Sequence, residues 1–299
     1  MGVSRRVALL GLGGVVVLGA AGGGFELVDH AVLPGKGRLD EALGRCDAEA
    51  PAHPAVPRAA PPPVLTGTFR SARRNRDVAY ALVYPPGHAR GERLPVCLAL
   101  HGFGSNAAQA VSTGGYAALL AGAVGAGAAP FAIAAADGGD GYWHPHAADD
   151  PLGMLVEDFL PFLAGEGLDA GRAAVAGWSM GGYGALLCGL TYRDRFRLVV
   201  ASSPAIFRDY ADAERVNAGA FDSAAEWARY DVTGRAAEFA GLRFRVDIGA
   251  ADPFAPAVRR LRDRLPDPSV VTLSTGCHDG RYWDAVAPGQ VAAIAAALG

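Results

Sequence analysis

Short apolar runs alternate with helix-like segments along most of the chain after residue 64. Pro95–Leu100 is apolar at every position, as expected for a strand buried on both faces of a sheet. The runs predict strands at Val64–Phe69, Val78–Tyr84, Pro95–Leu100, Phe131–Ala136, Ala173–Ala176, Leu198–Ala201, Phe244–Gly249 and Ser269–Leu273. The segments between them predict helices around 116–123, 153–163, 180–191, 256–264 and 283–298.

This alternation predicts an α/β fold, a mostly parallel, doubly wound sheet with helices on both faces. One domain over residues 64–299 accommodates every element. The stretch 205–240 has no clear strand and is rich in Ala, Asp and aromatic residues, so we expect a small cap over a site there. Residues 25–63 form an N-terminal extension with a short helix-like stretch at 38–43, and it ends in a Pro- and Ala-rich linker.

Residues 1–24 have the pattern of an export signal or anchor. Arg5 and Arg6 precede an apolar run from Val7 to about Ala21, and the run ends in small residues. The run is shorter than the roughly 20 residues that a membrane-spanning helix needs. Because residues 4–9 resemble a twin-arginine signal, we expect an exported protein, extracellular or associated with the cell envelope. An ordinary signal or an uncleaved anchor is the alternative.

Composition narrows the class of function. The formal net charge of −3 offers no basic surface for nucleic acid, so no nucleic-acid partner is expected. With 51% hydrophobic and 19% charged residues, the chain is globular rather than disordered. Four cysteines do not make a disulfide scaffold, and the sequence does not show how Cys46, Cys97, Cys188 and Cys277 pair. Cys97 and Cys188 lie in predicted core elements, which favours buried thiols.

The segment Gly177-Trp-Ser-Met-Gly181 matches the pattern Gly-x-Ser-x-Gly between a predicted strand and a predicted helix. A turn this tight forces strained backbone angles on the central serine, and side chains two residues before and after would collide. The serine oxygen then stands at a helix N-terminus, where N–H groups favour negative charge. Ser179 is therefore the predicted nucleophile, and a glycine-rich helix start with an incidental serine is the alternative.

Chain order predicts the base and the acid. In a nucleophile-elbow site they follow the serine, and His278 is the single histidine after Ser179. Asp252 lies just beyond the predicted strand 244–249, at the sheet edge where ligand chemistry occurs in open α/β sheets. We predict that Asp252 accepts the imidazole N–H and fixes its tautomer. Asp247 and Asp279 are the alternatives.

The backbone N–H groups of Met180 and Phe103 are the expected oxyanion donors. Met180 follows the nucleophile, and Phe103 lies in the turn after the strand 95–100. His101, in the same turn, precedes the nucleophile, and this position fits a structural role.

Two tryptophans are candidates for a substrate pocket. Trp143 follows a predicted strand at the same sheet edge, and Trp178 is the neighbour of the predicted nucleophile. Packing is the alternative role for Trp178. No metal site is predicted, because no carboxylate or cysteine lies at ligand spacing from His144 and His146.

From about Gly67 to the C-terminus, the chain resembles the Putative esterase family of α/β-hydrolases, which includes esterase D (S-formylglutathione hydrolase) and the mycolyltransferases. The resemblance rests on Leu100-His-Gly102, Asp137-Gly-Gly139 with Tyr142-Trp143, Glu157-Asp-Phe-Leu-Pro161 and Gly177-Trp-Ser-Met-Gly-Gly-Tyr-Gly-Ala-Leu186. It implies an α/β-hydrolase fold and a Ser-Asp-His hydrolase without cofactor, with the triad at Ser179, Asp252 and His278.

The expected function is hydrolysis of small-molecule or glycan carboxylic esters through an acyl-enzyme. An acyltransferase that uses an envelope sugar or alcohol as acceptor is the alternative, because its first half-reaction is identical. A non-catalytic binding protein on the same scaffold is a third hypothesis, and the intact order of serine, acid and histidine speaks against it. Neither the substrate nor the oligomeric state follows from the sequence.

Overall fold

The computed structural model describes residues 46, 48–52 and 57–299. The export signal expected at 1–24 and the helix-like stretch at 38–43 lie outside the described residues. Across the described part of the chain, no helix has the length and apolar character needed to cross a membrane.

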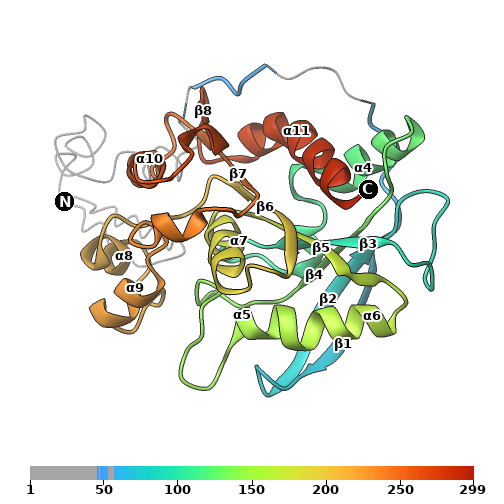
Figure 1. The fold of residues 1–299 in the computed structure, drawn as a ribbon, viewed down its shortest axis with the longest axis horizontal. Helices are drawn as coiled ribbons and strands as arrows, with labels where there is room; N and C mark the ends of the chain where they lie inside the picture. The colour runs from blue at the N-terminus through green and yellow to red at the C-terminus, as the bar shows by residue number, and fades with distance from the viewer. Residues whose placement is uncertain (1–45, 47, 53–56) are drawn as a thin grey trace, which may run out of the picture.

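An eight-stranded sheet runs through the domain in the order β1-β2-β4-β3-β5-β6-β7-β8 (Figure 1). β1 and β2 pair antiparallel, β2 pairs antiparallel with β4, and all further neighbours are parallel. The strands are β1 (Leu65–Ser71), β2 (Arg76–Val83), β3 (Pro95–Leu100), β4 (Ala132–Ala136), β5 (Asp169–Trp178), β6 (Phe196–Ser202), β7 (Phe244–Gly249) and β8 (Val271–Ser274). The expected α/β-hydrolase fold is confirmed.

The burial of each strand explains its sequence pattern. Every residue of β3 and β4 is buried, so both strands are apolar throughout. β5 is longer than predicted, because its first four residues include Asp169 and Arg172 and are not buried. They carry no apolar pattern, yet the Asp169 N–H donates to the Leu94 carbonyl at 2.8 Å and extends the pairing.

Helices cover both faces of the sheet (Figure 1). One face carries the apolar side chains of α3 (Ala107–Ala110), α4 (Tyr116–Gly125) and α11 (Gly280–Leu298). The other face carries α5 (Pro151–Gly153), the π-helical η2 (Met154–Phe159) and α6 (Leu160–Gly165), which follow one another without a break, together with α7 (Met180–Thr191) and α10 (Ala255–Arg262). Short 3₁₀ turns are η1 (Thr113–Gly115), η3 (Ala236–Phe239) and η4 (Pro268–Val270).

The segment 205–240, described in full, contains α8 (Tyr210–Val216), α9 (Ala224–Tyr230) and η3, and no strand. It packs on the loop after β4 and on α7. The Tyr142 ring lies 5.0 Å from the Phe207 ring, and the Tyr183 hydroxyl donates to the Tyr230 carbonyl at 2.9 Å. The segment therefore forms a small lobe beside the carboxyl ends of the strands, at the left of Figure 1.

The described residues of the N-terminal extension contact the domain at two places. The Ala59 N–H donates to the Ala118 carbonyl of α4 at 3.2 Å. Cys46 forms a disulfide with Cys277, with the two Cα atoms 6.1 Å apart, and Arg281 donates to the Cys46 carbonyl at 2.9 Å. The other two cysteines, Cys97 and Cys188, are free and buried, as predicted.

Candidate active site

Ser179 lies in the turn between β5 and α7 with φ 56° and ψ −120°. A non-glycine residue reaches such a conformation only with strain, and strained residues cluster at functional sites. A Cβ at Gly177 would lie 2.1 Å from the Gly181 carbonyl oxygen, and a Cβ at Gly181 would lie 2.0 Å from the Leu100 carbonyl oxygen. Glycine is therefore required at both positions, as the nucleophile-elbow pattern predicts.

Ser179, His278 and Asp252 lie in one line of hydrogen bonds. His278 Nε2 is 2.9 Å from Ser179 Oγ, and His278 Nδ1 is 2.8 Å from Asp252 Oδ2. Asp252 and His278 are both buried, at 3% and 8% exposure. Because the carboxylate can only accept, Nδ1 carries the proton and Nε2 is the acceptor that faces the serine hydroxyl.

The ends of three elements position these side chains. Asp252 follows β7, and its Oδ1 accepts the Phe254 N–H at 2.8 Å, which leaves Oδ2 to face the imidazole. His278 lies in the loop between β8 and α11, and the next residue, Asp279, caps α11. The rings of Phe254 and Trp283 flank the His278 ring at 5.2 and 5.5 Å.

The two alternative acids are engaged elsewhere. Asp247 is fully buried in β7, where it accepts from Arg245 at 2.7 and 2.9 Å and from Gln290 at 2.7 Å. This hydrogen-bonded carboxylate raises the pKa of Arg245. Asp279 accepts the Tyr282 N–H at 3.0 Å at the start of α11. Asp252 is therefore the acid that the fold brings to His278.

Both predicted oxyanion donors lie beside Ser179. Met180 is the first residue of α7, so its N–H has no acceptor within the helix. A Cβ at Gly102 would lie 3.6 Å from Ser179 Cβ, so the turn that carries the Phe103 N–H passes next to the serine. The Gly104 N–H donates to Asp140 Oδ1 at 2.7 Å, which ties this turn to the loop after β4.

His101 connects the same two loops. The Gly138 N–H donates to His101 Nε2 at 2.9 Å, so Nδ1 carries the proton and donates to the Gly102 carbonyl at 2.8 Å. Burial lowers the pKa of His101, which favours the neutral ring. These bonds agree with the structural role expected for His101.

The prediction that Trp143 and Trp178 line a substrate pocket is wrong. Trp143 has no exposed surface, because its ring fills a slot in which a Cβ on Gly138 would lie 2.5 Å away. Trp178 is 2% exposed and packs edge-on against Tyr116 at 4.8 Å. Both side chains belong to the core beneath the site.

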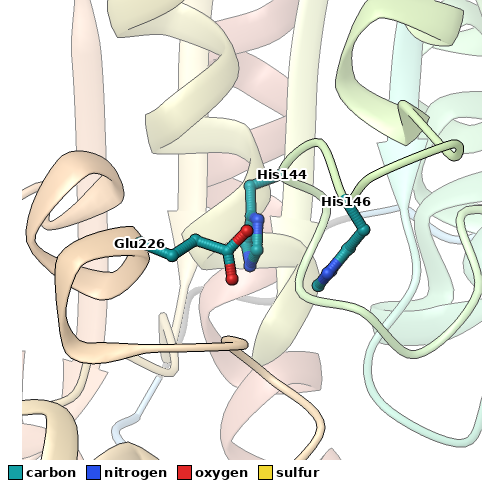
Figure 2. Close-up of side chains that lie close together, drawn as sticks. All are labelled: His144, His146 and Glu226. Carbon is teal, nitrogen blue, oxygen red and sulfur yellow. The ribbon is translucent and has the colours of Figure 1, made fainter.

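One member of a further group of side chains, Glu226, has no signal in the sequence. The structure brings Glu226 of α9 to His144 and His146, and the ligand atoms of the three residues lie within 4.8 Å of one another (Figure 2). Local spacing predicts no carboxylate for these histidines. Glu226 arrives because the segment 205–240 folds back on the loop after β4.

Comparisons with known proteins identify the fold and the family. A search of curated protein sequences finds no match to the chain. Among solved structures, a ferulic acid esterase is 20% identical, covers 79% of this chain and 98% of its own, and has a TM-score of 0.65. An S-formylglutathione hydrolase from Agrobacterium tumefaciens is 18% identical. The alignment covers 83% of this chain and 100% of the hydrolase, with a TM-score of 0.63. Mycobacterium tuberculosis MPT51 (FbpC1) is 19% identical. The alignment covers 81% of this chain and 100% of MPT51, with a TM-score of 0.60.

At these identities the solved structures show a shared fold. The family is assigned by a match to the protein-family model described as "Putative esterase". The match covers residues 71–262, well over half of the chain. The match includes Ser179 and Asp252 and ends before His278. The chain belongs to the Putative esterase family.

Proposed function

We propose that this protein hydrolyses carboxylic esters through an acyl-enzyme. Ser179 Oγ attacks the ester carbonyl, His278 Nε2 takes the hydroxyl proton and passes it to the leaving alcohol, and Asp252 stabilises the imidazolium. Water then attacks the acyl-enzyme with the same imidazole as base and releases the acid. The line of hydrogen bonds through both His278 nitrogens, at 2.9 and 2.8 Å, carries the proposal.

The negative charge that develops on the carbonyl oxygen needs donors that are already in place. We assign this role to the Met180 and Phe103 N–H groups. Removal of one such donor typically lowers the rate by about 10²–10³. The hydrogen bond from Gly104 to Asp140 supports the assignment, because it holds the turn of Phe103 beside the serine.

The proposed substrate is a small-molecule or glycan ester. One similar solved structure is named as a ferulic acid esterase, and another is a CE1 ferulic acid esterase from Anaeromyces mucronatus in complex with ferulic acid. A panel of aryl, alkyl and sugar esters of increasing acyl length tests the substrate class.

Replacement of Ser179 by alanine tests the mechanism. We expect Ser179→Ala to lower kcat for a short p-nitrophenyl ester by about 10⁴–10⁶, because the nucleophile is lost while the fold remains. Ser269→Ala, on the exposed turn before β8, is the matched control and should keep the wild-type rate. A Ser179→Ala enzyme that turns over at the wild-type rate would remove the proposal. Labelling of the wild type by a fluorophosphonate separates an enzyme from a binding protein on the same scaffold.

Acyl transfer to an alcohol or sugar shares the same acyl-enzyme, so the side chains around Ser179 support both reactions. Product analysis separates them. Release of free acid at every acceptor concentration supports hydrolysis, and a new ester that grows with added acceptor supports transfer.

Export to the cell envelope or the medium is also proposed. The basic and apolar pattern of residues 1–24 supports it, and so does the Cys46–Cys277 disulfide, because such bonds persist in oxidising compartments. Fractionation of expressing cells tests it, and a protein held entirely in the cytoplasm would contradict it.

A further inference from the structure

A group of nitrogen and oxygen donors lies between the loop after β4 and α9, apart from the line of Ser179, His278 and Asp252. His144 and His146 come from the loop, and Glu226 comes from α9 (Figure 2). The two imidazole centroids are 4.2 Å apart. In Figure 2 the Glu226 carboxylate reaches His144 from one side, and His146 stands on the other.

Backbone carbonyls orient both imidazoles. His144 Nε2 lies 2.6 Å from the Ala220 carbonyl oxygen, and His146 Nε2 lies 2.7 Å from the Gly141 carbonyl oxygen. A carbonyl only accepts, so each Nε2 carries a proton, and in a neutral ring the lone pair is then on Nδ1. Histidines that bind metal ions typically donate their other N–H to a carbonyl or carboxylate in this way.

His144 is the fixed member of the group. It has no exposed surface, and its ring stacks on the rings of Phe221 and Tyr230, each at 4.7 Å. His144 Nδ1 also lies 3.1 Å from the Pro145 carbonyl oxygen. With the ring proton on Nε2, Nδ1 has no proton to donate to this carbonyl.

Two carboxylates approach the histidines. Glu226 Oε2 accepts the Asp222 N–H at 2.5 Å, a bond within the segment 205–240 at the start of α9. Asp222 Oδ2 lies 3.9 Å from His146 Nδ1, and its side chain is 71% exposed and can move. The group therefore combines imidazole nitrogens with negative charge, the pairing expected for a divalent cation.

We propose that His144, His146 and Glu226 form a binding site for a divalent transition-metal ion, with Zn²⁺ as the ion that the donors favour. Two imidazoles and a carboxylate are a recognised zinc donor set. Neighbouring ligand atoms around zinc lie roughly 3.3 Å apart for metal–ligand bonds of about 2.0–2.1 Å. The ligand atoms of the three residues lie within 4.8 Å of one another in the structure, so they must move closer together when the ion binds. The half-buried Glu226 side chain can move, while His144 stays in place. Water or Asp222 completes the tetrahedron.

Such an ion would connect two parts of the protein that are distant in sequence. The loop after β4 also carries Asp140, which holds the turn beside Ser179, and α9 belongs to the lobe 205–240. The bound ion would stabilise the lobe against this loop. Its role is structural, and ester hydrolysis does not require it in the mechanism above.

Zinc titration of chelator-treated protein tests the site. We expect one Zn²⁺ per chain by calorimetry and, at a free concentration of 100 times Kd, a rise in Tm of about 5–10 °C.

Two variants test the proposed ligands. Glu226→Gln keeps an oxygen that can accept the Asp222 N–H but removes the charge, and His146→Ala removes a ligand. Each should weaken binding at least about tenfold. His88→Ala is the matched control, because His88 lies 2.6 Å from Glu92 in a two-residue pair and should leave zinc affinity unchanged.

The visible spectrum of the wild type with Co²⁺ provides a readout that needs no variant. Wild-type protein with Co²⁺ should show the visible absorption of a tetrahedral site, and Glu226→Gln should lose it. Absence of Zn²⁺ binding, or equal affinity in the wild type and in Glu226→Gln, would overturn the proposal. The second result would place the ion on other residues of the chain.

Discussion

At the scale of single residues, the site depends on a carboxylate with both oxygens occupied. Asp252 Oδ1 accepts from the Phe254 backbone and Oδ2 faces His278 Nδ1, so the carboxylate cannot rotate without breaking a hydrogen bond. This arrangement fixes the imidazole tautomer and leaves Nε2 as the acceptor for Ser179. The orientation of the base is thus set by a residue that does not touch the serine.

Asp252→Asn tests that dependence. An amide in place of the carboxylate favours the wrong tautomer and does not stabilise the imidazolium, so kcat should fall by about 10⁴ with little change in Tm. Asp279→Asn is the matched control, because asparagine also caps a helix and the rate should stay near that of the wild type. A loss below tenfold in Asp252→Asn, measured by ester turnover, would show that another group orients His278.

At the scale of elements, a very close backbone contact joins the end of β3 to the start of α7. Gly181 lies against the Leu100 carbonyl, and Gly177 lies against Gly181. Backbone atoms cannot move aside as a flexible side chain can, so α7 can approach the sheet only with glycine at these positions. The close approach also holds Ser179 in its strained conformation.

Gly181→Ala should therefore destabilise the protein strongly. The new Cβ would lie 2.0 Å from a backbone oxygen, and we expect a loss of about 3–5 kcal/mol in the free energy of unfolding. Gly125→Ala in α4 adds the same methyl group where nothing lies within 4 Å, so its stability should be unchanged or slightly higher. Urea denaturation of both variants measures the difference, and equal midpoints would contradict the steric argument.

The Cys46–Cys277 disulfide ties the N-terminal extension to the loop of His278. Cys46→Ser should lower the free energy of unfolding by about 2–5 kcal/mol, because the bond restricts the unfolded chain. Well below Tm, ester turnover should change little, since Asp252, Phe254 and Trp283 still hold the imidazole. Reductant should lower the Tm of the wild type and leave that of Cys46→Ser unchanged. A wild type insensitive to reductant would argue against the bond.

At the scale of the whole molecule, the carboxyl edge of the parallel strands gathers the chemistry. Ser179, Asp252 and His278 follow β5, β7 and β8, and His101 follows β3. His101 is buried at this edge, and burial lowers its pKa below the ordinary value. A neutral histidine inside the fold becomes a proton acceptor when the chain unfolds.

This burial predicts loss of stability in mild acid. Below about pH 6.5 the unfolded chain binds a proton at His101 that the folded protein does not, so the free energy of unfolding falls as the pH falls. The slope reaches at most about 1.4 kcal/mol per pH unit for this one group. Urea denaturation of the wild type and of His101→Gln between pH 7 and 5 measures it. The variant should show the smaller slope, and equal slopes would contradict the assignment.

Local patterns were sufficient for the order of the strands, because residues buried on both faces of a sheet must be apolar throughout. They also predicted the longer helices, but not the short helices α3, α8 and α9. They failed at the start of β5, where exposed polar residues pair without an apolar signal. Gly177 and Gly181 were also predictable from the nucleophile-elbow pattern, although the structure shows that Gly181 is required by the distant Leu100 carbonyl. The order of residues along the chain pointed to His278 and Asp252, because the carboxyl ends of parallel strands lie along one edge of the sheet.

Other features required the folded chain. Trp143 and Trp178 fill slots formed by glycines and by α4, and a linear sequence does not tell a buried indole from one that lines a pocket. The pairing of Cys46 with Cys277 and the approach of Glu226 to His144 and His146 join residues with no local relation. Contacts of this kind arise from the packing of whole segments, which depends on shape complementarity across the molecule rather than on the pattern along any one stretch.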